Sequence, residues 1–179
     1  MNMIKNLKYL LMAIVVLALS SCEKEDIGNT STVAVAGEWM VQVDVVNASG
    51  ETVYEDPYGM GYVTMITYNT NADNGKEMYV SDLGNFWLFT VKVPCDVNAR
   101  TFGSSTPVPN EAYADGALYD IDVTLNNGKI VEKGTLSPAG SPVDSIEFNV
   151  SFSDDTNFPA GYTYYVHGYR RTGLNGGAE

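Results

Sequence analysis

The sequence predicts an all-β fold, a single antiparallel barrel or sandwich of about eight strands. Three observations support this prediction. Beyond residue 36, apolar and polar residues alternate in short segments rich in Val, Thr and Tyr; turn signals with Gly and Asn separate these segments; and no apolar stripe has the length and period of a helix. The chain of 179 residues is long enough for one domain with a hydrophobic core.

The alternation defines the predicted strands. In the first of them, Trp39, Val41 and Val43 point to one face of the sheet and polar residues to the other. Aromatic and β-branched residues, which favour strands, dominate the later segments. The predicted strands are Gly37 to Val46, Gly61 to Asn69, Met78 to Ser81, Asn85 to Val93, Tyr119 to Leu125, Lys129 to Leu136, Ser145 to Phe152 and Tyr162 to Arg171.

Two connections carry specific expectations. Asn127-Gly128 can supply the two positive φ angles of a type I′ turn and therefore predicts a hairpin between Tyr119 to Leu125 and Lys129 to Leu136. The stretch from Arg100 to Ala117 is rich in breakers and has little periodicity, which predicts a long loop. Loops of this length are functional, here as a lid on the barrel mouth, or disordered, and both readings stay open.

The N-terminus has the features of a secretory signal. Lys5 and Lys8 precede an apolar run from Leu10 to Leu19 that is too short to span a bilayer. Leu19-Ser20-Ser21-Cys22 resembles the lipobox of bacterial lipoproteins, in which the cysteine is acylated, for example with palmitate, and becomes the mature N-terminus. The alternatives are an ordinary signal peptide with an incidental cysteine, or an uncleaved anchor.

These segments predict the domain organisation. We expect a signal peptide over residues 1–21, the lipidated Cys22 and a flexible tether over 22–35, the β domain over 36–174 and a disordered tail over 175–179. The acidic cluster directly after Cys22 resembles the export signal that carries some Gram-negative lipoproteins to the outer face of the outer membrane; a solvated linker is the alternative. The expected location is the cell envelope, as an outer-membrane lipoprotein.

Composition restricts the partners. The formal net charge is −12, and removal of residues 1–21 takes away two of the ten basic residues and no acidic one, which leaves −14. Such a charge excludes nucleic acid as a partner and a basic membrane-binding patch, so an acyl anchor would have to hold the protein at the membrane. With Cys22 acylated, Cys95 has no disulfide partner, and without a basic neighbour we expect an inert buried thiol.

Two ends of the domain suggest a known fold. Gly37-Glu38-Trp39 at the start of the first strand, with Arg170 or Arg171 at the end of the last, resembles the signature of lipocalin-like barrels, the calycins. The resemblance implies that the guanidinium lies across the Trp39 indole and closes the base of the barrel.

A longer resemblance covers most of the domain, from Gly37 to Leu174. It rests on five motifs, which are, in order, Thr67-Tyr68-Asn69-Thr70, Asn85-Phe86-Trp87, Val143-Asp144-Ser145-Ile146, Phe152-Ser153-Asp154-Asp155 and Gly168-Tyr169-Arg170-Arg171-Thr172-Gly173. Together these motifs are similar to those of the bacterial lipoprotein family called lipid-binding putative hydrolases. The sequence departs from the family pattern at Leu174, where phenylalanine is expected. The resemblance implies a lipocalin-like barrel and a lipid ligand.

Catalytic and metal-binding patterns are weak. His167 is the only histidine, alternates with tyrosines on a strand and is predicted to be a wall residue rather than a base; no Gly-x-Ser-x-Gly elbow occurs. Asn69 to Gly75 resembles a calcium loop, but its glycine comes one place late and no glutamate closes the frame. We therefore predict no catalytic residue, no metal site and no cofactor.

The aromatic residues are the best candidates for binding. Tyrosine combines an apolar ring with a polar tip, which suits a cavity for an amphiphile. An eight-stranded barrel either holds one small ligand or is filled by side chains, and the sequence leaves both open. We predict binding of a small lipid-like ligand without catalysis; a weak lipid or glycan ester hydrolase and an interaction subunit without a ligand are the alternatives. The predicted ligand-binding residues are Trp87, Phe89, Tyr119, Phe148, Phe152 and Tyr164.

Overall fold

The computed structural model describes residues 29–173. This part of the chain contains twelve strands and no helix, and accordingly offers no helical segment that could cross a membrane. The strands are β1 Gly37–Val46, β2 Thr52–Tyr54, β3 Val63–Asn69, β4 Glu77–Ser81, β5 Thr90–Asp96, β6 Thr101–Phe102, β7 Val108–Pro109, β8 Tyr113–Ala114, β9 Ala117–Leu118, β10 Asp122–Leu136, β11 Pro142–Phe152 and β12 Thr163–Arg170.

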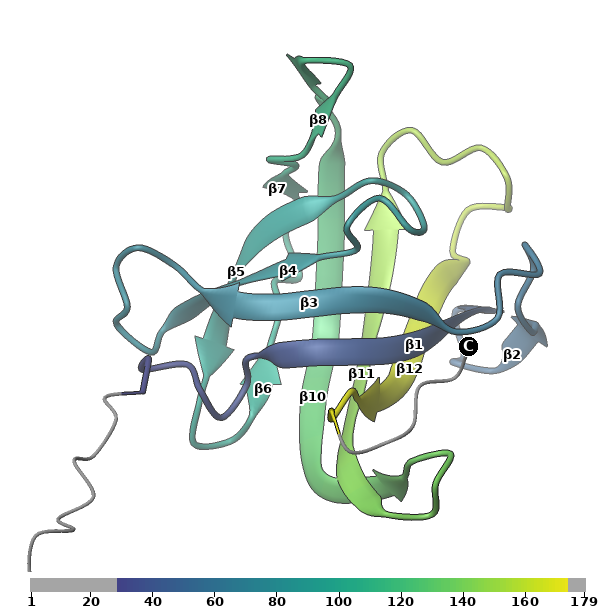
Figure 1. The fold of residues 1–179 in the computed structure, drawn as a ribbon. Helices are drawn as coiled ribbons and strands as arrows, with labels where there is room; N and C mark the ends of the chain where they lie inside the picture. Colours follow the sequence, from purple (N-terminus) through teal and green to yellow (C-terminus); the bar gives the residue numbers. More distant parts are fainter. Residues whose placement is uncertain (1–28, 174–179) are drawn as a thin grey trace, which may run out of the picture.

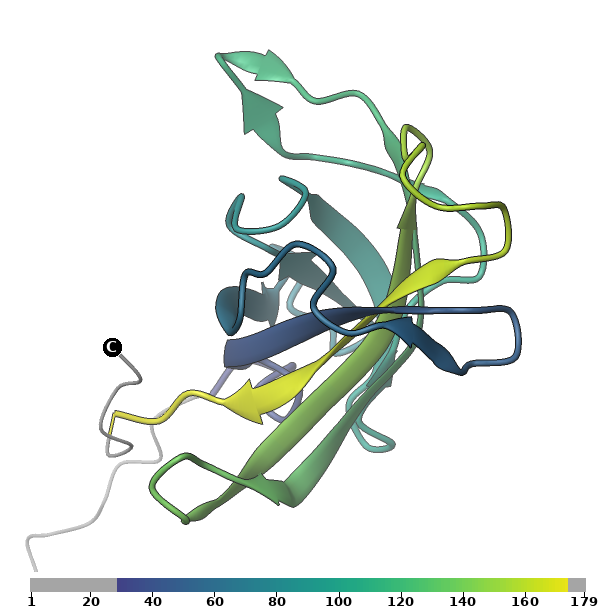
Figure 2. The same cartoon turned by 90° about the vertical axis from the view of Figure 1, so that its right-hand side faces the viewer.

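Eight strands form a closed antiparallel barrel, which confirms the predicted fold class (Figure 1). In the order β1, β3, β4, β5, β6, β10, β11 and β12, each strand pairs with the next, and β12 pairs back with β1 to complete the cylinder. β2 adds to the edge of β1, and β7 adds to β10. β8 and β9 form a separate hairpin, the flap, which stands out from the barrel at the top of both views (Figures 1 and 2).

The barrel has two chemically different ends. At one end, the base, the start of β1 meets the end of β12, so that Trp39 lies opposite Arg170 and Met65. At the other end, the mouth, Val45 pairs with Tyr164, and the connections 47–62, 82–89, 103–121 and 153–162 meet there. Both ends of the described chain lie at the base.

The predicted hairpin at Asn127-Gly128 is wrong. β10 runs through both residues as one long strand, and its pairing with β11 shifts register between Asn126 and Lys129. Asn127 has a φ of 55°, but this angle serves a bulge that bends the strand rather than a turn. Gly128 allows a close approach, because a Cβ atom there would collide with the Phe102 carbonyl.

One of the eight barrel strands, β6, comes from the segment between Arg100 and Ala117 that was expected to be a long loop. β6, only two residues long, bridges β5 and β10, and β7, β8 and β9 follow before β10 begins. The expectation of a structureless connection from Arg100 to Ala117 is therefore wrong. The stretch from Asn85 to Phe89, expected as the start of a strand, is a turn, and β5 begins at Thr90.

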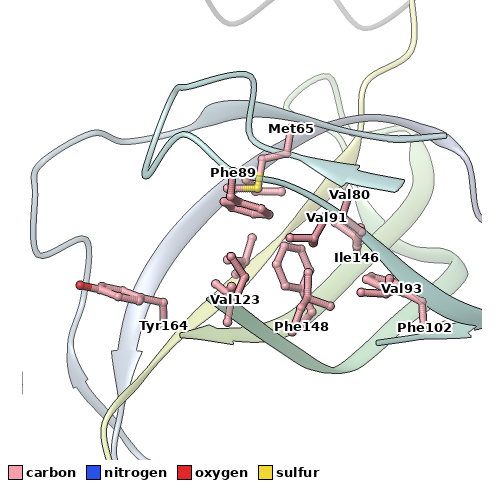
Figure 3. Close-up of a cluster of buried hydrophobic side chains, with 14 of the residues drawn as sticks. Met65, Val80, Phe89, Val91, Val93, Phe102, Val123, Ile146, Phe148 and Tyr164 are labelled. Atoms are coloured by element: carbon pink, nitrogen blue, oxygen red, sulfur yellow. The ribbon is translucent and has the colours of Figure 1, made fainter. Parts of the chain in front are cut away.

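Inward-facing side chains from all sides of the barrel form one contiguous hydrophobic core (Figure 3). The alternation in β1 buries Trp39, Val41 and Val43, as expected from its pattern. Val35 adds to this core at the base, where the Thr67 hydroxyl donates to the Val35 carbonyl at 2.7 Å. Contacts with the barrel thus extend to residues before the expected domain start at residue 36.

The contacts described above for the barrel and its two ends all lie within residues 29–173. A chain that starts at residue 23 contains all of these contacts and is therefore expected to fold on its own. Cys22, the predicted signal peptide over residues 1–21 and the predicted tail over 175–179 lie outside the described residues.

Candidate functional site

The mouth of the barrel contains a cluster of interlocking aromatic rings. Trp87 stacks flat on Phe152, with ring centroids 4.6 Å apart and planes 2° apart. Phe86 meets Tyr164 edge-on at 4.9 Å and lies 5.8 Å from Phe152, while Phe89 packs beneath Phe152 at 5.5 Å. We call these five residues the aromatic mouth. Phe86 and Trp87 are only partly buried, so their rings form a boundary between core and solvent.

A single buried carboxylate shapes the turn that carries three of these rings. The two side-chain oxygens of Asp82 accept hydrogen bonds from the backbone N–H groups of Gly84, Phe86, Trp87, Leu88 and Phe89 at 2.7–3.0 Å. Asp82 itself is fully buried. Because charge-assisted hydrogen bonds are strong and five donors converge on one group, Asp82 holds the turn in a single conformation.

Asp154 joins three of the segments that meet at the mouth, namely 82–89, 103–121 and 153–162. Its Oδ1 accepts a hydrogen bond from Trp87 Nε1 at 3.0 Å, and its Oδ2 accepts one from the Tyr119 hydroxyl. The bond to Asp154 raises the pKa of Tyr119 above its ordinary value. Tyr119 follows the flap, and Asn110 precedes it; the Asn110 amide donates to the carbonyls of Tyr119 and Leu88. The root of the flap is thereby fixed to the β4–β5 turn.

Tyr164 reaches from the core to the rim of the mouth. Its ring is buried, and its hydroxyl points away from the core cluster in Figure 3. That hydroxyl lies 2.7 Å from the Tyr58 hydroxyl, which also accepts a hydrogen bond from the Asn157 amide. Burial, and then the contact with Tyr58, raises the pKa of Tyr164 well above its ordinary value. The Tyr164 hydroxyl therefore stays protonated near neutral pH, and the two hydroxyls offer polar tips at the edge of an apolar surface.

The rim outside the aromatic mouth combines exposed apolar side chains with negative charge. Seven of the ten exposed large hydrophobic side chains of the described residues belong to the connections at this end. One of them, Tyr62, packs against Tyr169 on the outside of the barrel, and the others are Val53, Tyr54, Tyr58, Leu83, Tyr113 and Leu118. The same connections carry eight carboxylates besides Asp82 and no Lys, Arg or His; these are Glu51, Glu55, Asp56, Glu111, Asp115, Asp120, Asp154 and Asp155. The basic residues of the described chain lie on barrel strands or at the base.

The structure separates the predicted ligand-binding residues into two groups. Trp87, Phe89, Phe152 and Tyr164 lie together in the aromatic mouth, and Tyr119 joins them through Asp154. Phe148 lies deeper, 5.8 Å from Phe102 and toward the base, where it is a fully buried core residue.

The predicted closing residues meet at the base, with one distinction between the two arginines. The Arg170 guanidinium lies 4.5 Å from the centroid of the Trp39 ring and donates to the Ala36 carbonyl at 2.6 Å. Arg171 instead pairs with the exposed carboxylate of Glu38. Trp39 Nε1 donates to the Thr67 hydroxyl at 2.8 Å, so the buried indole has its one polar group satisfied.

His167 and Cys95 lie outside the mouth. His167 is on the outward face of β12, where its Nε2 is 3.1 Å from Asp44 Oδ2. Cys95 is partly buried on β5, and burial raises the pKa of its thiol, which makes the reactive thiolate scarcer. Within residues 29–173, no group of three or more His, Cys, Asp or Glu side chains is placed to hold a metal ion.

Sequence reasoning missed several residues that build this site, above all Asp82, Phe86, Tyr58 and Asp154. Asp82 was recognisable in part, since Asp followed by Gly and Asn before an aromatic run is typical of a turn in which the side chain caps backbone N–H groups. The roles of Tyr58 and Asp154 depend on partners far along the chain, and no local pattern indicates them.

Comparison with known proteins shows which family the chain resembles. No curated protein matches the sequence. The family described as lipid-binding putative hydrolase matches residues 24–175, which include the whole barrel and both of its ends. The match agrees with the closed barrel and with the family motifs in the sequence, and it supports a lipid-binding role. The chain therefore belongs to the lipid-binding putative hydrolase family.

Proposed function

We propose that this protein is a membrane-anchored lipoprotein of the cell envelope that binds a small amphipathic, lipid-like molecule at the aromatic mouth without transforming it. The aromatic mouth is the observation that carries the proposal. It presents partly exposed Phe86 and Trp87 over a rigid turn, with the Tyr58 and Tyr164 hydroxyls at the edge. Apolar faces beside fixed polar groups are the usual composition of sites for small amphiphiles.

The packed core of the barrel restricts where the ligand can bind. Below the aromatic mouth, fully buried side chains such as Phe148, Val166 and Trp39 occupy the barrel down to its base. Protein interiors are close-packed, so a ligand in a deep calyx would have to displace these side chains. A ligand held among the mouth rings and the exposed apolar rim needs no such rearrangement.

The negative charge of the rim also restricts the head group of the ligand. The connections at this end carry eight carboxylates besides Asp82 and no basic side chain. A carboxylate or phosphate head group would meet repulsion and find no ion-pair partner, whereas an uncharged or cationic head group would not. The preferred ligand is therefore a neutral or cationic amphiphile rather than a free fatty acid.

Binding without catalysis is supported by the position of His167. The side chain points to the outside of the barrel, and its hydrogen-bond partner among the described residues is Asp44 rather than a nucleophile. A hydrolase with a nucleophile activated by histidine would need that histidine near the ligand, and the mouth connections contain none.

Fluorescence titration tests the mouth as the binding site. The chain has two tryptophans, Trp87 at the mouth and Trp39 at the base. With residues 23–179, we expect dodecyl maltoside and dodecyltrimethylammonium, below their micellar concentrations, to shift the emission of Trp87 to shorter wavelength. Dodecanoate should bind about ten-fold more weakly at low ionic strength, because charge repulsion is then least screened.

Two variants make the titration specific. Trp87→Phe keeps an aromatic ring and should abolish the spectral shift while binding persists by calorimetry. Val131→Ala, which truncates an exposed side chain on β10 outside the mouth, should leave the shift intact. Absence of binding by all three dodecyl compounds, or an unchanged shift in Trp87→Phe, would refute the mouth as the site.

The anchor is tested separately. We expect Cys22→Ser in the full-length chain to prevent acylation, so that the folded protein moves from the membrane fraction to the soluble fraction after cell fractionation. Retention of Cys22→Ser in the membrane fraction, together with the absence of a labelled fatty acid on the wild-type protein, would contradict the lipobox assignment. Neither result depends on what the barrel binds.

A further inference from the structure

The outer face of the barrel carries a second site, which we call the outer groove. It has a volume of about 430 Å³ and is bounded by the outward side chains of β11 and β12, by Tyr62, and by the segment 134–138 near the β10–β11 connection. This volume falls within the roughly 300–1,000 Å³ typical of small-molecule sites. Side chains alternate along a strand, so residues of β12 that line the outer groove face away from the core and from the aromatic mouth.

Aromatic rings form the walls of the outer groove. Tyr62 is 47% exposed and packs edge-on against Tyr169 at 5.4 Å. Next to them, the Tyr165 and His167 rings stack at 5.1 Å with planes 19° apart. Rings held by such contacts lose little conformational freedom when a ligand packs on them. An exposed ring face of this kind packs well on the C–H face of a pyranose.

Polar groups in the outer groove are already oriented. Glu147 Oε2 accepts the Tyr165 hydroxyl at 2.8 Å, which leaves Oε1 free of a side-chain partner among the described residues. His167 is held through Nε2 by Asp44, so Nδ1 is the nitrogen left for a ligand. Burial, and then the bond to Glu147, raises the pKa of Tyr165 to about 12, so its hydroxyl remains a donor at neutral pH.

The chemistry of the lining excludes two other ligand classes. No Lys or Arg lines the outer groove, so a phosphate or sulfate group would face Glu147 without a cationic partner. Hydroxyl, carboxylate and imidazole groups line much of the wall, so an acyl chain would leave them unpaired and dehydrated. A ligand rich in uncharged hydroxyl groups satisfies both constraints.

We propose that the outer groove binds a neutral saccharide, with Tyr62 packing on a sugar ring and Glu147 and His167 hydrogen-bonding to its hydroxyl groups. The outer groove lies on the outer face of the barrel, whereas the aromatic mouth lies at one end of it, so the two sites are separate. Saccharide binding in the outer groove and amphiphile binding at the mouth can therefore succeed or fail independently.

NMR titration of residues 23–179 tests this proposal. The probes are methyl glycosides of glucose, galactose, mannose and N-acetylglucosamine and their β-linked disaccharides. We expect at least one to shift the backbone amide signals of residues 145–147 and 165–169 at millimolar concentration or below. Absence of such shifts with every probe at saturating concentrations, or tighter binding of glucose 6-phosphate than of glucose, would overturn the proposal.

Variants separate a specific site from a general surface effect. Tyr62→Ala and Glu147→Gln should each lower the affinity for the saccharide at least ten-fold. Tyr62→Ala removes only an exposed ring, so the barrel should stay folded. Tyr113→Ala is the control, since it deletes an exposed tyrosine on the flap, outside the outer groove. Equal saccharide affinity in Tyr62→Ala, Glu147→Gln and the control would also overturn the proposal, whereas retained amphiphile binding in Tyr62→Ala and Glu147→Gln would confirm that the two sites are distinct.

Discussion

Replacing Trp39 by alanine is expected to lower the free energy of unfolding by about 3–5 kcal/mol, the range for loss of a large aromatic side chain from a core. Trp39 is fully buried, its Nε1 donates to Thr67, and Arg170 covers its ring. The substitution would leave a cavity at the base, deprive Arg170 of its cation–π partner and remove the donor to the Thr67 hydroxyl. Urea denaturation monitored by circular dichroism measures the loss.

The second tryptophan supplies a matched control. Trp87 is only partly buried and lies at the mouth, so Trp87→Ala should cost less than Trp39→Ala. Trp39→Phe keeps most of the apolar volume and should recover part of the loss. If Trp39→Ala melts like the wild-type protein, the contact between Trp39 and Arg170 does not close the barrel.

Replacing Asp82 by alanine is expected to destabilise the protein by about 3 kcal/mol or more, since hydrogen bonds to a charged group contribute about 1.5–3 kcal/mol each and buried unpaired donors are costly. Five backbone N–H groups lose their acceptor together, and Leu83 and Leu88 adopt positive φ angles of 55° and 64° in the same turn. These conformations are unfavourable for leucine and persist only because the turn is held.

Hydrogen exchange distinguishes a local effect of Asp82 from a global one. We expect the amides of Gly84 and Phe86 to Phe89 to lose protection in Asp82→Ala before the strands of the barrel do. Asp82→Asn keeps one carbonyl acceptor and should give an intermediate loss, and Asp120→Ala, which removes an exposed carboxylate at the same end, should change little. Wild-type protection of these amides in Asp82→Ala would show that other contacts define the turn.

The turn also links stability to binding. Phe86, Trp87 and Phe89 lie directly on the segment that Asp82 organises, so Asp82→Ala should weaken amphiphile binding although Asp82 itself is buried beneath the rings. Its effect on the outer groove should be small, because none of the residues that line the groove belongs to this turn.

Much of the barrel was predictable from the sequence alone. The period-two alternation depends only on the order of side chains, so it identified the all-β class and located β1, β11 and β12 to within a few residues. The same parity identified Phe148 and Phe152 of β11 as inward-facing residues, since the pleat carries successive side chains to opposite faces. Phe89 is also buried as expected, although it lies in a turn rather than in a strand.

Local backbone signals were ambiguous where more than one structure uses the same angles. Asn127 adopts the positive φ that its sequence allows, yet a bulge and a hairpin turn both accept that angle. The neighbouring strands decide between a bulge and a turn. β11 pairs with β10 on both sides of Asn127, and β6, two residues long, takes the place that a second hairpin strand would have occupied. A strand of two residues has no periodicity to detect.

The sequence by itself determined the strand pattern, the acidic charge, the lipoprotein-like N-terminus and the aromatic residues available for binding. Only the tertiary structure decided how they combine. Asp154 meets Trp87 across 67 positions, and His167 meets Asp44 across 123. Contacts at such separations depend on the closure and register of the whole barrel, which no segment specifies on its own. For this reason the aromatic mouth and the outer groove become visible only once β12 has paired with β1.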